Sequence, residues 1–392
     1  MPWKVCNPMD ERIQFIMLCQ KGLHSMVELC DLFGISRKTG YKWLKRYRKY
    51  GAPGLLERSR APHEIPHKSN KEVVNFIRRT MKRHPFWGGR KVRYYAQKKR
   101  PDLAIPSETT VSNIILREGL RRRKPKRKKP GHPGKPIYIT KEPNDLWTTD
   151  FKGEFKTRDG RYCYPLTIMD EHTRFIIEIK GLRSMKQKPV MQVFKDVFKQ
   201  YGLPRAIKSD NGNPFASTGI SRLSKLSVWW IKLGILPVLI EPGSPGQNAY
   251  HERMHKTLKE ETTYPADANL SIQNRTFKQW MYEYNYDRPH EYLNNNFPCE
   301  YYKPSSREYP MHRLGVKYPD HFEIRRVSAT SAIRWHSQYV SVGSVLIGEH
   351  LGLEPICDGI WAVYFSWKRI GFLDESKMKI LDTYGKIVRH KV

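Results

Sequence analysis

A run of positive charge near the middle of the chain divides it into parts that must fold separately. Eight of the ten residues from Arg121 to Pro130 are lysine or arginine, and the other two are proline. Like charges repel one another and proline cannot extend a helix, so this run cannot enter a packed core. We therefore expect an extended basic linker over residues 121–140, with folded domains on both sides of it.

The excess of positive charge extends over the whole chain. Among the 392 residues, 71 are lysine or arginine and 38 are aspartate or glutamate, so the formal net charge is +33. An excess of this size predicts a partner with dense negative charge, and nucleic acid is the first candidate. No segment has the roughly 18 consecutive apolar residues of a membrane span. We therefore expect no membrane partner. The six cysteines form no C-x-x-C pair, so we expect no disulfide framework and a reducing cytoplasm as the compartment.

Residues 1–60 are predicted to form a helix-turn-helix DNA-binding domain. Ser25 and Ser36 lie where helix N-caps are expected, and Gly34 lies where the second helix should end. Two short helices joined in this way are typical of a helix-turn-helix. The residues expected to contact DNA from the start of the recognition helix are Arg37, Lys38, Thr39 and Lys42. The alternative is an ordinary helical bundle with a solvated basic face.

Residues 61–120 are predicted to form a second helix-turn-helix domain. Apolar residues at helical spacing indicate a helix from Asn70 to His84 and another from Arg90 to Lys99. Ser107 lies at the expected N-cap of a third helix, which should end at Gly119.

The basic linker itself is predicted to follow a DNA phosphate backbone, because each cation that neutralises a phosphate releases a counterion. The residues expected to make these contacts are Arg121, Arg122, Arg123, Lys124, Lys126, Arg127, Lys128 and Lys129. The alternative is a solvated spacer or a localisation-type patch.

From about residue 145 the pattern changes from helices to strands. Three strands are expected over Leu146–Phe155, Tyr162–Met169 and Phe175–Ile179, followed by alternating helices and strands. Such an order predicts a mixed sheet covered by helices, an α/β layered core over residues 141–305.

The last part of the chain, residues 306–392, has a different pattern. Short strands from Phe322 onward are separated by turns such as Asp358-Gly359. This pattern predicts a small β-barrel. The fold class expected for the whole chain is therefore multidomain α/β.

Three acidic residues of the α/β core lie where a metal site could form. Asp150 is inside the first strand, Asp210 closes a short buried strand, and Glu252 is in the first turns of a helix that follows a glycine- and proline-rich loop. Phosphodiester cleavage by two divalent ions needs carboxylates on rigid elements, converging on metals roughly 3.5–4 Å apart. We therefore predict that these three residues are catalytic and bind the metal. Asp170 is a rival acid, which we interpret as a turn residue.

The helix expected from Gln247 to about Glu261 should present two different faces. At about 100° per residue, one face has Asn248, Glu252, Lys256 and Lys259. The opposite, core-facing side has Tyr250, Met254 and Leu258. This singles out Glu252 among its acidic neighbours and predicts that Asn248, Lys256 and Lys259 contact DNA beside the metal site, where lysine suits a phosphate as a flexible point charge.

Several blocks of this sequence resemble those of bacterial insertion-sequence transposases of the DDE type, which have a retroviral-integrase-like catalytic core. The three signature blocks are Trp147–Asp150, Ser209–Gly212 and Pro242–Arg253. Further similar blocks are Leu258–Glu261, Tyr284–His290 and, in the helix-turn-helix, Phe33–Thr39. One departure concerns spacing: Asp210 and Glu252 have 41 residues between them, more than is usual in the family, and a longer helix through Leu226–Trp230 is expected to accommodate the excess.

The resemblance implies an RNase H-like fold and a cofactor of two Mg²⁺ (or Mn²⁺) ions per active site. It implies binding to the terminal inverted repeats of a mobile element, followed by metal-dependent strand cleavage and strand transfer. The partners would be double-stranded DNA, both element ends and target, and further copies of the chain, at least a dimer when assembled on DNA. The place would be the bacterial cytoplasm, at the nucleoid.

Two other classes of function compete with this one. His251-Glu252-Arg253-Met254-His255 matches H-E-x-x-H, in which both histidines bind zinc and the glutamate is a general base. Zinc metalloproteases usually have uncharged residues where Arg253 and Lys256 lie here, and the motif leaves the net charge unexplained. A non-catalytic DNA-binding regulator would explain the charge and the helix-turn-helix, but it would leave the three carboxylates without a role.

Overall fold

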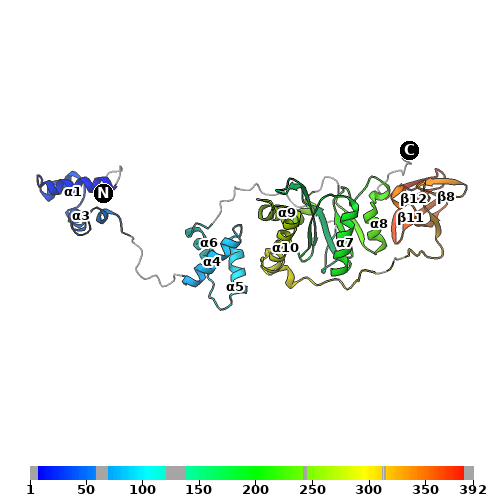
Figure 1. Cartoon of the computed structure of the whole chain (residues 1–392), viewed down its shortest axis with the longest axis horizontal. Coiled ribbons are helices and arrows are strands. Elements are labelled where there is room, and N and C mark those ends of the chain that lie inside the picture. The colour runs from blue at the N-terminus through cyan, green and yellow to red at the C-terminus, as the bar shows by residue number, and fades with distance from the viewer. Residues whose placement is uncertain are drawn as a thin grey trace. The chain divides into compact units, whose positions relative to one another are not determined.

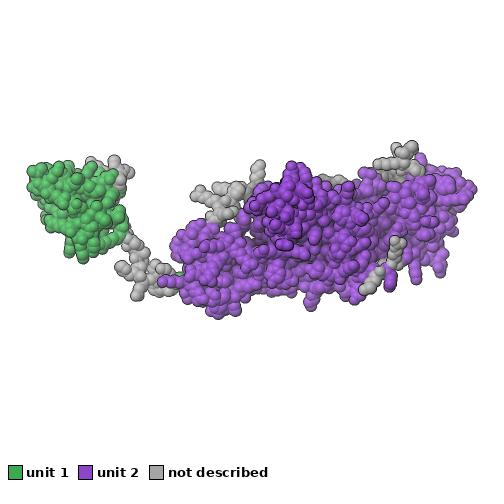
Figure 2. All heavy atoms as spheres, viewed as in Figure 1, with its two compact units in different colours: residues 1–69 green, residues 70–392 purple. Residues whose placement is uncertain are grey.

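A computed structural model of the chain describes residues 8–58, 69–120, 138–241, 245–310, 312 and 315–383. The chain divides into two compact units, residues 1–69 and 70–392 (Figure 2). The basic run Arg121–Lys129 lies outside the described residues, so its predicted DNA contacts stay a prediction. Within the described ranges, none of the helices combines the length and the apolar character that a membrane crossing requires.

The first unit is a small helical domain. Its elements are α1 (Pro8–Lys21), α2 (Met26–Leu32), α3 (Arg37–Tyr50) and the 3₁₀ turn η1 (Ala52–Leu55). Ser25 and Glu28 form a capping box at the start of α2, because each side chain bonds the backbone N–H of the other residue. Gly34 turns the chain between α2 and α3 with φ +64°, a conformation that favours glycine. The predicted helices and turn are therefore confirmed.

The second unit begins with three helices, α4 (Lys71–Arg83), α5 (Gly89–Lys99) and α6 (Glu108–Arg117). They enclose a separate apolar core that includes Ile77, Val92 and Ile114. Ion pairs join this group to the end of α10 (Leu270–Tyr286) and the residue after it: Arg83 to Glu283 at 3.1 Å and Lys99 to Asp287 at 2.6 Å.

A six-stranded mixed sheet forms the centre of the second unit (Figure 1). Its strands are β1 (Leu146–Phe151), β2 (Phe155–Lys156), β3 (Tyr162–Asp170), β4 (Ile176–Leu182), β5 (Ala206–Ser209) and β6 (Leu236–Leu239). β1 pairs with β3 antiparallel and with β5 parallel, and β5 pairs with β6 parallel. This confirms the mixed sheet that the sequence predicted.

Helices cover both faces of this sheet. On one face, α7 (Gln187–Tyr201) and α8 (Lys225–Lys232) share a core with Trp147 and Ile207. On the other face, α9 (Ala249–Thr262) and α10 share a core with Met169. Figure 1 shows these two pairs of helices on opposite sides of the strands. Since side chains alternate along a strand, the residues next to Trp147 and Ile207, which are Thr148 and Lys208, point to the α9 face.

The segment between β5 and β6 differs from the longer helix expected through Leu226–Trp230. A 3₁₀ turn, η2 (Ile220–Arg222), comes first, and Ser224 then caps the shorter α8. Ser221 has φ 46°, outside the range of a right-handed helix, so the two cannot merge. The longer spacing between Asp210 and Glu252 therefore does not form a longer helix, and that prediction is wrong. The physical reason is that Ile220, Leu223 and Ile231 pack into a core shared with the C-terminal strands.

The C-terminal part forms an antiparallel five-stranded sheet and a two-stranded hairpin. The elements are β7 (Glu323–Arg326), β8 (Ala332–Trp335), β9 (Gln338–Ser341), β10 (His350–Cys357), β11 (Ile360–Phe365), β12 (Lys368–Asp374) and β13 (Lys379–Asp382). The sheet has the order β13-β12-β11-β10-β7, and β8 pairs with β9. The β-structure predicted here is therefore confirmed, but the pairing leaves β7 and β13 at the edges and does not show a closed barrel. The sequence missed β8 and β13, which are four residues each.

Candidate active site

Two of the three predicted carboxylates leave the sheet at the same ends of neighbouring strands. β1 and β5 run parallel, and Thr148 of β1 is the pairing partner of Lys208 of β5. Asp150 and Asp210 each lie two residues beyond that pair, so both follow it along the same direction and on the same face. Asp150 is half-buried at the end of β1, opposite Thr167 of β3, and Asp210 is half-buried just after β5 ends.

Glu252 lies on the exposed side of α9, above the same face of the sheet. Lys256 and Lys259 are exposed with it, as the periodicity predicted, and Met254 and Leu258 are buried on the opposite side. Two of the predictions for this helix are wrong. Tyr250 is 45% exposed, and Asn248 is buried, with 7% exposed, so Asn248 does not share the face of Glu252.

The physical reason for this difference lies at the start of the helix. Residues Pro245–Asn248 form a 3₁₀ turn, and the α-helix begins only at Ala249. The buried stripe is His251, Met254, His255 and Leu258, which includes two polar residues that periodicity could not place in a core. The α-helical periodicity counted from Gln247 therefore does not apply to Asn248, which lies in the 3₁₀ turn before the helix.

Burial and the neighbouring acids disturb the ionisation of Asp150. Burial, followed by the nearby charges of Asp210 and Glu252, raises the pKa of Asp150 to about 7. Burial also raises the pKa of Asp210, whose carboxylate accepts a bond from the Gly212 N–H at 3.2 Å. The charges of Asp210 and Glu252 therefore act on Asp150, although in the described part of the chain no three acidic, histidine or cysteine side chains close into a ready-made metal cage.

The chemistry of this donor set fits a divalent cation. Mg²⁺ and Mn²⁺ prefer oxygen ligands, and Mg²⁺ is usually bound by only one or two carboxylates with water and phosphate in the other positions. Burial and the charges of Asp210 and Glu252 disfavour the ionised form of Asp150, and a cation bound between the carboxylates would stabilise that form. Asp150, Asp210 and Glu252 are the residues that could hold such an ion.

The two histidines of the H-E-x-x-H match do not point toward Glu252. The ring nitrogens of His251 lie 2.7 Å from the Thr148 Oγ1 and 2.6 Å from the Thr167 Oγ1, and both threonines belong to the sheet. The Nε2 of His255 lies 2.7 Å from the same Thr167 hydroxyl. Burial, with nearby Lys208, lowers the pKa of His251 to about 3, so the ring is neutral. The zinc-protease interpretation is therefore wrong, because both histidines face the sheet whereas Glu252 is exposed.

Asp170, the rival acid, which the sequence predicted as a turn residue, is the last residue of β3, and its side chain binds the turn that follows. Its Oδ1 accepts bonds from the N–H and the hydroxyl of Thr173 at 2.8 and 2.6 Å, and its Oδ2 accepts one from the Asn144 N–H at 2.8 Å. The side chain is completely buried. All its oxygen atoms are thus occupied by the turn that follows β3.

Two lysines near the carboxylates were not found from the sequence. Lys152 is half-buried two residues after Asp150; burial and nearby Lys259 lower its pKa, whereas Asp150 and Glu252 act in the opposite direction. Lys208 is buried two residues before Asp210. The alternation of side chains along a strand could have predicted both lysines, because residues two positions apart point to the same face. Lys152 is two positions from Asp150, and Lys208 is two positions from Asp210.

The recognition-helix residues predicted in the first unit lie on the surface of α3. Ser36 caps this helix through the Thr39 N–H at 3.3 Å. Arg37, Lys38 and Lys42 are exposed, and Thr39 is partly exposed. Their side chains are thus available to a ligand, and contact with DNA stays a prediction.

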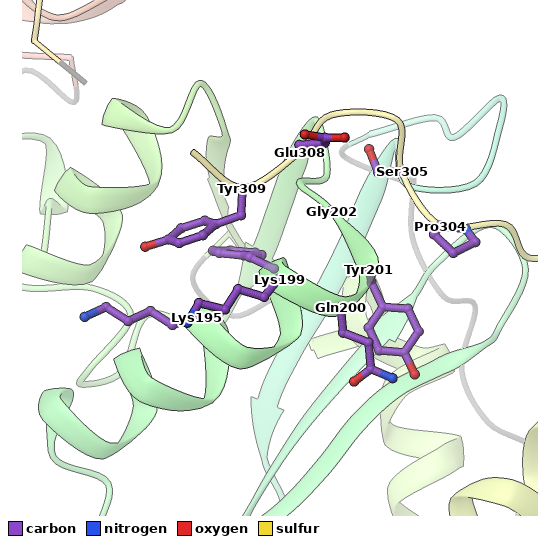
Figure 3. Close-up of a pocket in the computed structure, with 10 residues that line it drawn as sticks. Lys195, Lys199, Gln200, Tyr201, Gly202, Pro304, Ser305, Glu308 and Tyr309 are labelled. Atoms are coloured by element: carbon purple, nitrogen blue, oxygen red, sulfur yellow. The ribbon is translucent and has the colours of Figure 1, made fainter. Parts of the chain in front are cut away.

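A cavity of about 930 Å³ lies elsewhere on the second unit, between the end of α7 and residues 304–309 (Figure 3). Its lining includes Lys195, Lys199, Tyr201 and Tyr309, and none of the three carboxylates. This cavity is therefore separate from the three carboxylates.

Comparison with known protein families places this site in a class. Residues 140–245 and 233–298 match the integrase core domain family, and these ranges contain all three carboxylates. Residues 11–63 match a helix-turn-helix domain, and residues 39–115 match a homeodomain-like domain. The central part of the chain thus resembles an integrase core, and the part before it resembles helix-turn-helix domains.

Two of the curated relatives come from bacterial insertion elements. The chain is 28% identical over 204 residues to the insertion element IS476 uncharacterized 39.2 kDa protein of Xanthomonas euvesicatoria, an alignment that covers 52% of this chain and 57% of the relative. It is 27% identical to the insertion element IS407 uncharacterized 31.7 kDa protein of Burkholderia multivorans, covering 41% of this chain and 55% of the relative. The chain therefore spans little more than half the length of these relatives.

One similar solved structure is the HTLV-2 integrase catalytic core domain in complex with magnesium, at 12% identity and a TM-score of 0.33, covering 41% of this chain and 97% of that one. The resemblance stated from the sequence, to insertion-sequence transposases with a retroviral-integrase-like core, is confirmed by the family matches and the curated relatives.

Proposed function

We propose that this protein is a DNA transposase that binds the terminal inverted repeats of a mobile element and catalyses metal-dependent strand cleavage and strand transfer. The observation that supports this most is the meeting of Asp150, Asp210 and Glu252 at one edge of an integrase core, where they raise the pKa of Asp150 together. Strongly shifted pKa values of neighbouring acids are more frequent at functional sites than elsewhere in a protein.

In this proposal the three carboxylates hold two Mg²⁺ or Mn²⁺ ions. When bound, such ions activate the attacking water or 3′-hydroxyl and stabilise charge on the scissile phosphate. The protein supplies rigid positions for the ligands on β1, after β5 and on α9. Exposed Lys256 and Lys259, with Lys152 beside them, attract the phosphate to the edge where the carboxylates lie.

The partners in this proposal are double-stranded DNA, as element ends and as target, and at least one further copy of the chain, because two ends must be joined together. We also propose the domain division 1–60, 61–120, 121–140, 141–305 and 306–392. The C-terminal part would be a small barrel, because the β8–β9 hairpin contacts both edge strands of the sheet, β7 and β13.

The experiment that tests the function uses a labelled duplex with the inverted repeat that flanks the gene. With Mg²⁺ or Mn²⁺ we expect nicking at the repeat end and joined products, and with EDTA neither. A protein that binds the repeat tightly but cuts nothing with either metal would instead be the non-catalytic regulator.

Recognition by α3 leads to a first prediction. A bidentate contact of arginine with guanine contributes about 1–3 kcal/mol of discrimination, so Arg37→Ala should weaken binding to the repeat by about tenfold or more and leave binding to unrelated DNA nearly unchanged. Lys45→Ala removes one exposed cation later in the same helix and is the matched control. Fluorescence anisotropy with both duplexes measures the ratio; equal losses on both would show that Arg37 only neutralises phosphate.

The exposed lysines of α9 lead to a second prediction. Lys256→Ala and Lys259→Ala should each lower end cleavage at least tenfold, about 1.4 kcal/mol in activation free energy, because a phosphate at the site would lose a nearby cation. Lys278→Ala, an exposed lysine of α10, is the control with the same change of charge. Single-turnover cleavage at saturating protein is the measurement, and wild-type rates for both α9 variants would contradict a phosphate-holding role.

A further inference from the structure

A buried lysine connects the strand of Asp210 to the helix of Glu252. Lys208 lies in β5 with 5% of its surface exposed. Its Nζ is 2.5 Å from the Glu171 Oε2 and donates a hydrogen bond of 2.9 Å to the backbone carbonyl of Gln247. A buried ammonium group is costly unless it is paired and hydrogen-bonded, and both needs are met here by these contacts.

Gln247 is the residue through which this lysine reaches the helix. It belongs to the 3₁₀ turn Pro245–Asn248, which leads directly into α9. Its side chain is fixed as well: its amide nitrogen donates to the Glu241 Oε2 at 2.9 Å, and its oxygen accepts from the Glu241 N–H at 3.0 Å. The turn that leads into α9 is therefore bound to Lys208 of β5 and to Glu241, which follows β6.

One turn further along, the neighbouring strand holds the same helix. Thr148, the pairing partner of Lys208 across β1 and β5, contacts His251 at 2.7 Å. Glu252 is the next residue after His251. Two paired positions of the parallel strands β1 and β5 thus bind the 3₁₀ turn before α9 and the first turn of α9. Asp150 and Asp210 follow two residues later along the chain in each case.

We propose that Lys208 is a positioning residue, which sets the place of Glu252 relative to Asp150 and Asp210 by binding the start of α9. The effect of Lys208 on cleavage rests on the proposed function, whereas its binding of the start of α9 does not. Glu252 is exposed, and among the described residues no hydrogen bond or ion pair joins its carboxylate to the sheet, so its position depends on where the helix begins. Lysine fits this task because its long stem crosses the layer and its ammonium group has three donors.

The test compares two double variants that each remove one ion pair of this unit. Lys208→Met with Glu171→Gln removes the contact to Gln247 and leaves no unpaired charge in the core. Lys232→Met with Glu349→Gln is the matched control, because that pair also has an N–O distance of 2.5 Å but joins α8 to the C-terminal part. Amide hydrogen exchange of peptides covering residues 245–255 is the first measurement.

We expect exchange in these peptides to become at least about tenfold faster in the Lys208 variant and to stay unchanged in the control. Lys208→Arg keeps the charge paired with Glu171 and should give an intermediate rate, which provides a folded variant if the double one does not fold. Wild-type exchange over residues 245–255 in folded Lys208 variants would overturn the proposal.

The second measurement is end cleavage against Mg²⁺ concentration. The Lys208 double variant should need at least about fivefold more Mg²⁺ for half-maximal cleavage, since misplaced ligands bind the ion less well, while end binding stays within about twofold of wild type. An unchanged midpoint together with faster exchange would overturn the catalytic part. If the wild-type protein cleaves nothing, the proposed function fails, whereas the exchange result still decides whether Lys208 positions α9.

Discussion

Replacing Asp150 with asparagine is expected to abolish strand cleavage and strand transfer, lowering both rates at least about 1,000-fold, which is about 4 kcal/mol in activation free energy. Asp210→Asn and Glu252→Gln should have effects of the same size. Each substitution keeps the shape of the side chain but removes the negative charge that a divalent ion needs. The measurement is cleavage and joining of a labelled inverted-repeat duplex with Mg²⁺.

Binding to the same duplex separates a lost site from a lost fold. All three variants should bind the repeat as tightly as wild type, because the proposed sequence contacts lie in the N-terminal unit. Asp196→Asn on α7 and Glu260→Gln on α9 are matched controls that should keep full activity. Full activity in any one of the three carboxylate variants would remove that residue from the assignment.

The same Asp150→Asn substitution is expected to make the protein more stable at pH 8. The pKa of Asp150 is raised from 3.8 to about 7 in the folded chain. The native state is therefore favoured by the protonated form: this contribution is complete below pH 4, declines between pH 4 and 7, and is lost above pH 7. Asparagine does not ionise, so the variant should gain on the order of 2–4 kcal/mol in free energy of unfolding at pH 8, since one pKa unit is about 1.4 kcal/mol.

Urea unfolding at pH 4, 6 and 8 measures this difference for both proteins. The gain should be near zero at pH 4 and largest at pH 8. Millimolar Mg²⁺ should stabilise the wild-type protein at pH 8 but not the variant, because a bound cation compensates the same repulsion. A variant that is less stable than wild type at every pH would mean that the Asp150 carboxylate is satisfied by the fold and is no metal ligand.

Local signals in the sequence predicted most of the elements. Ser25, Ser36 and Ser107 cap helices where they were expected to, because an N-cap depends on bonds within one turn. The three core carboxylates could be placed for a similar reason, because a strand pattern surrounds Asp150, a short apolar strand precedes Asp210, and a glycine- and proline-rich loop precedes the helix of Glu252. These predictions need no knowledge of distant parts of the chain.

Contacts between distant segments account for what the sequence did not predict. The buried side of α9 contains His251 and His255 because Thr148 and Thr167, far away in the chain, provide hydrogen-bond partners. Helical periodicity treats histidine as polar and therefore cannot place it in a core. Lys208 was overlooked for the same reason, since its partners Glu171 and Gln247 are brought together only by the sheet.

The turn between β5 and α8 makes the C-terminal strands inseparable from the six-stranded sheet. The Ser221 hydroxyl bonds the Ile370 carbonyl at 2.5 Å, the Ser221 N–H bonds the Asp382 Oδ2 at 3.2 Å, and Ile231 is completely buried in the apolar cluster shared with those strands. A chain cut after residue 305 would leave this apolar surface in water and the serine without partners. The smallest stable unit that contains the central sheet therefore extends to the last strand, and a deletion that removes only β12 and β13 is expected to unfold the sheet while Asp150, Asp210 and Glu252 are all still encoded.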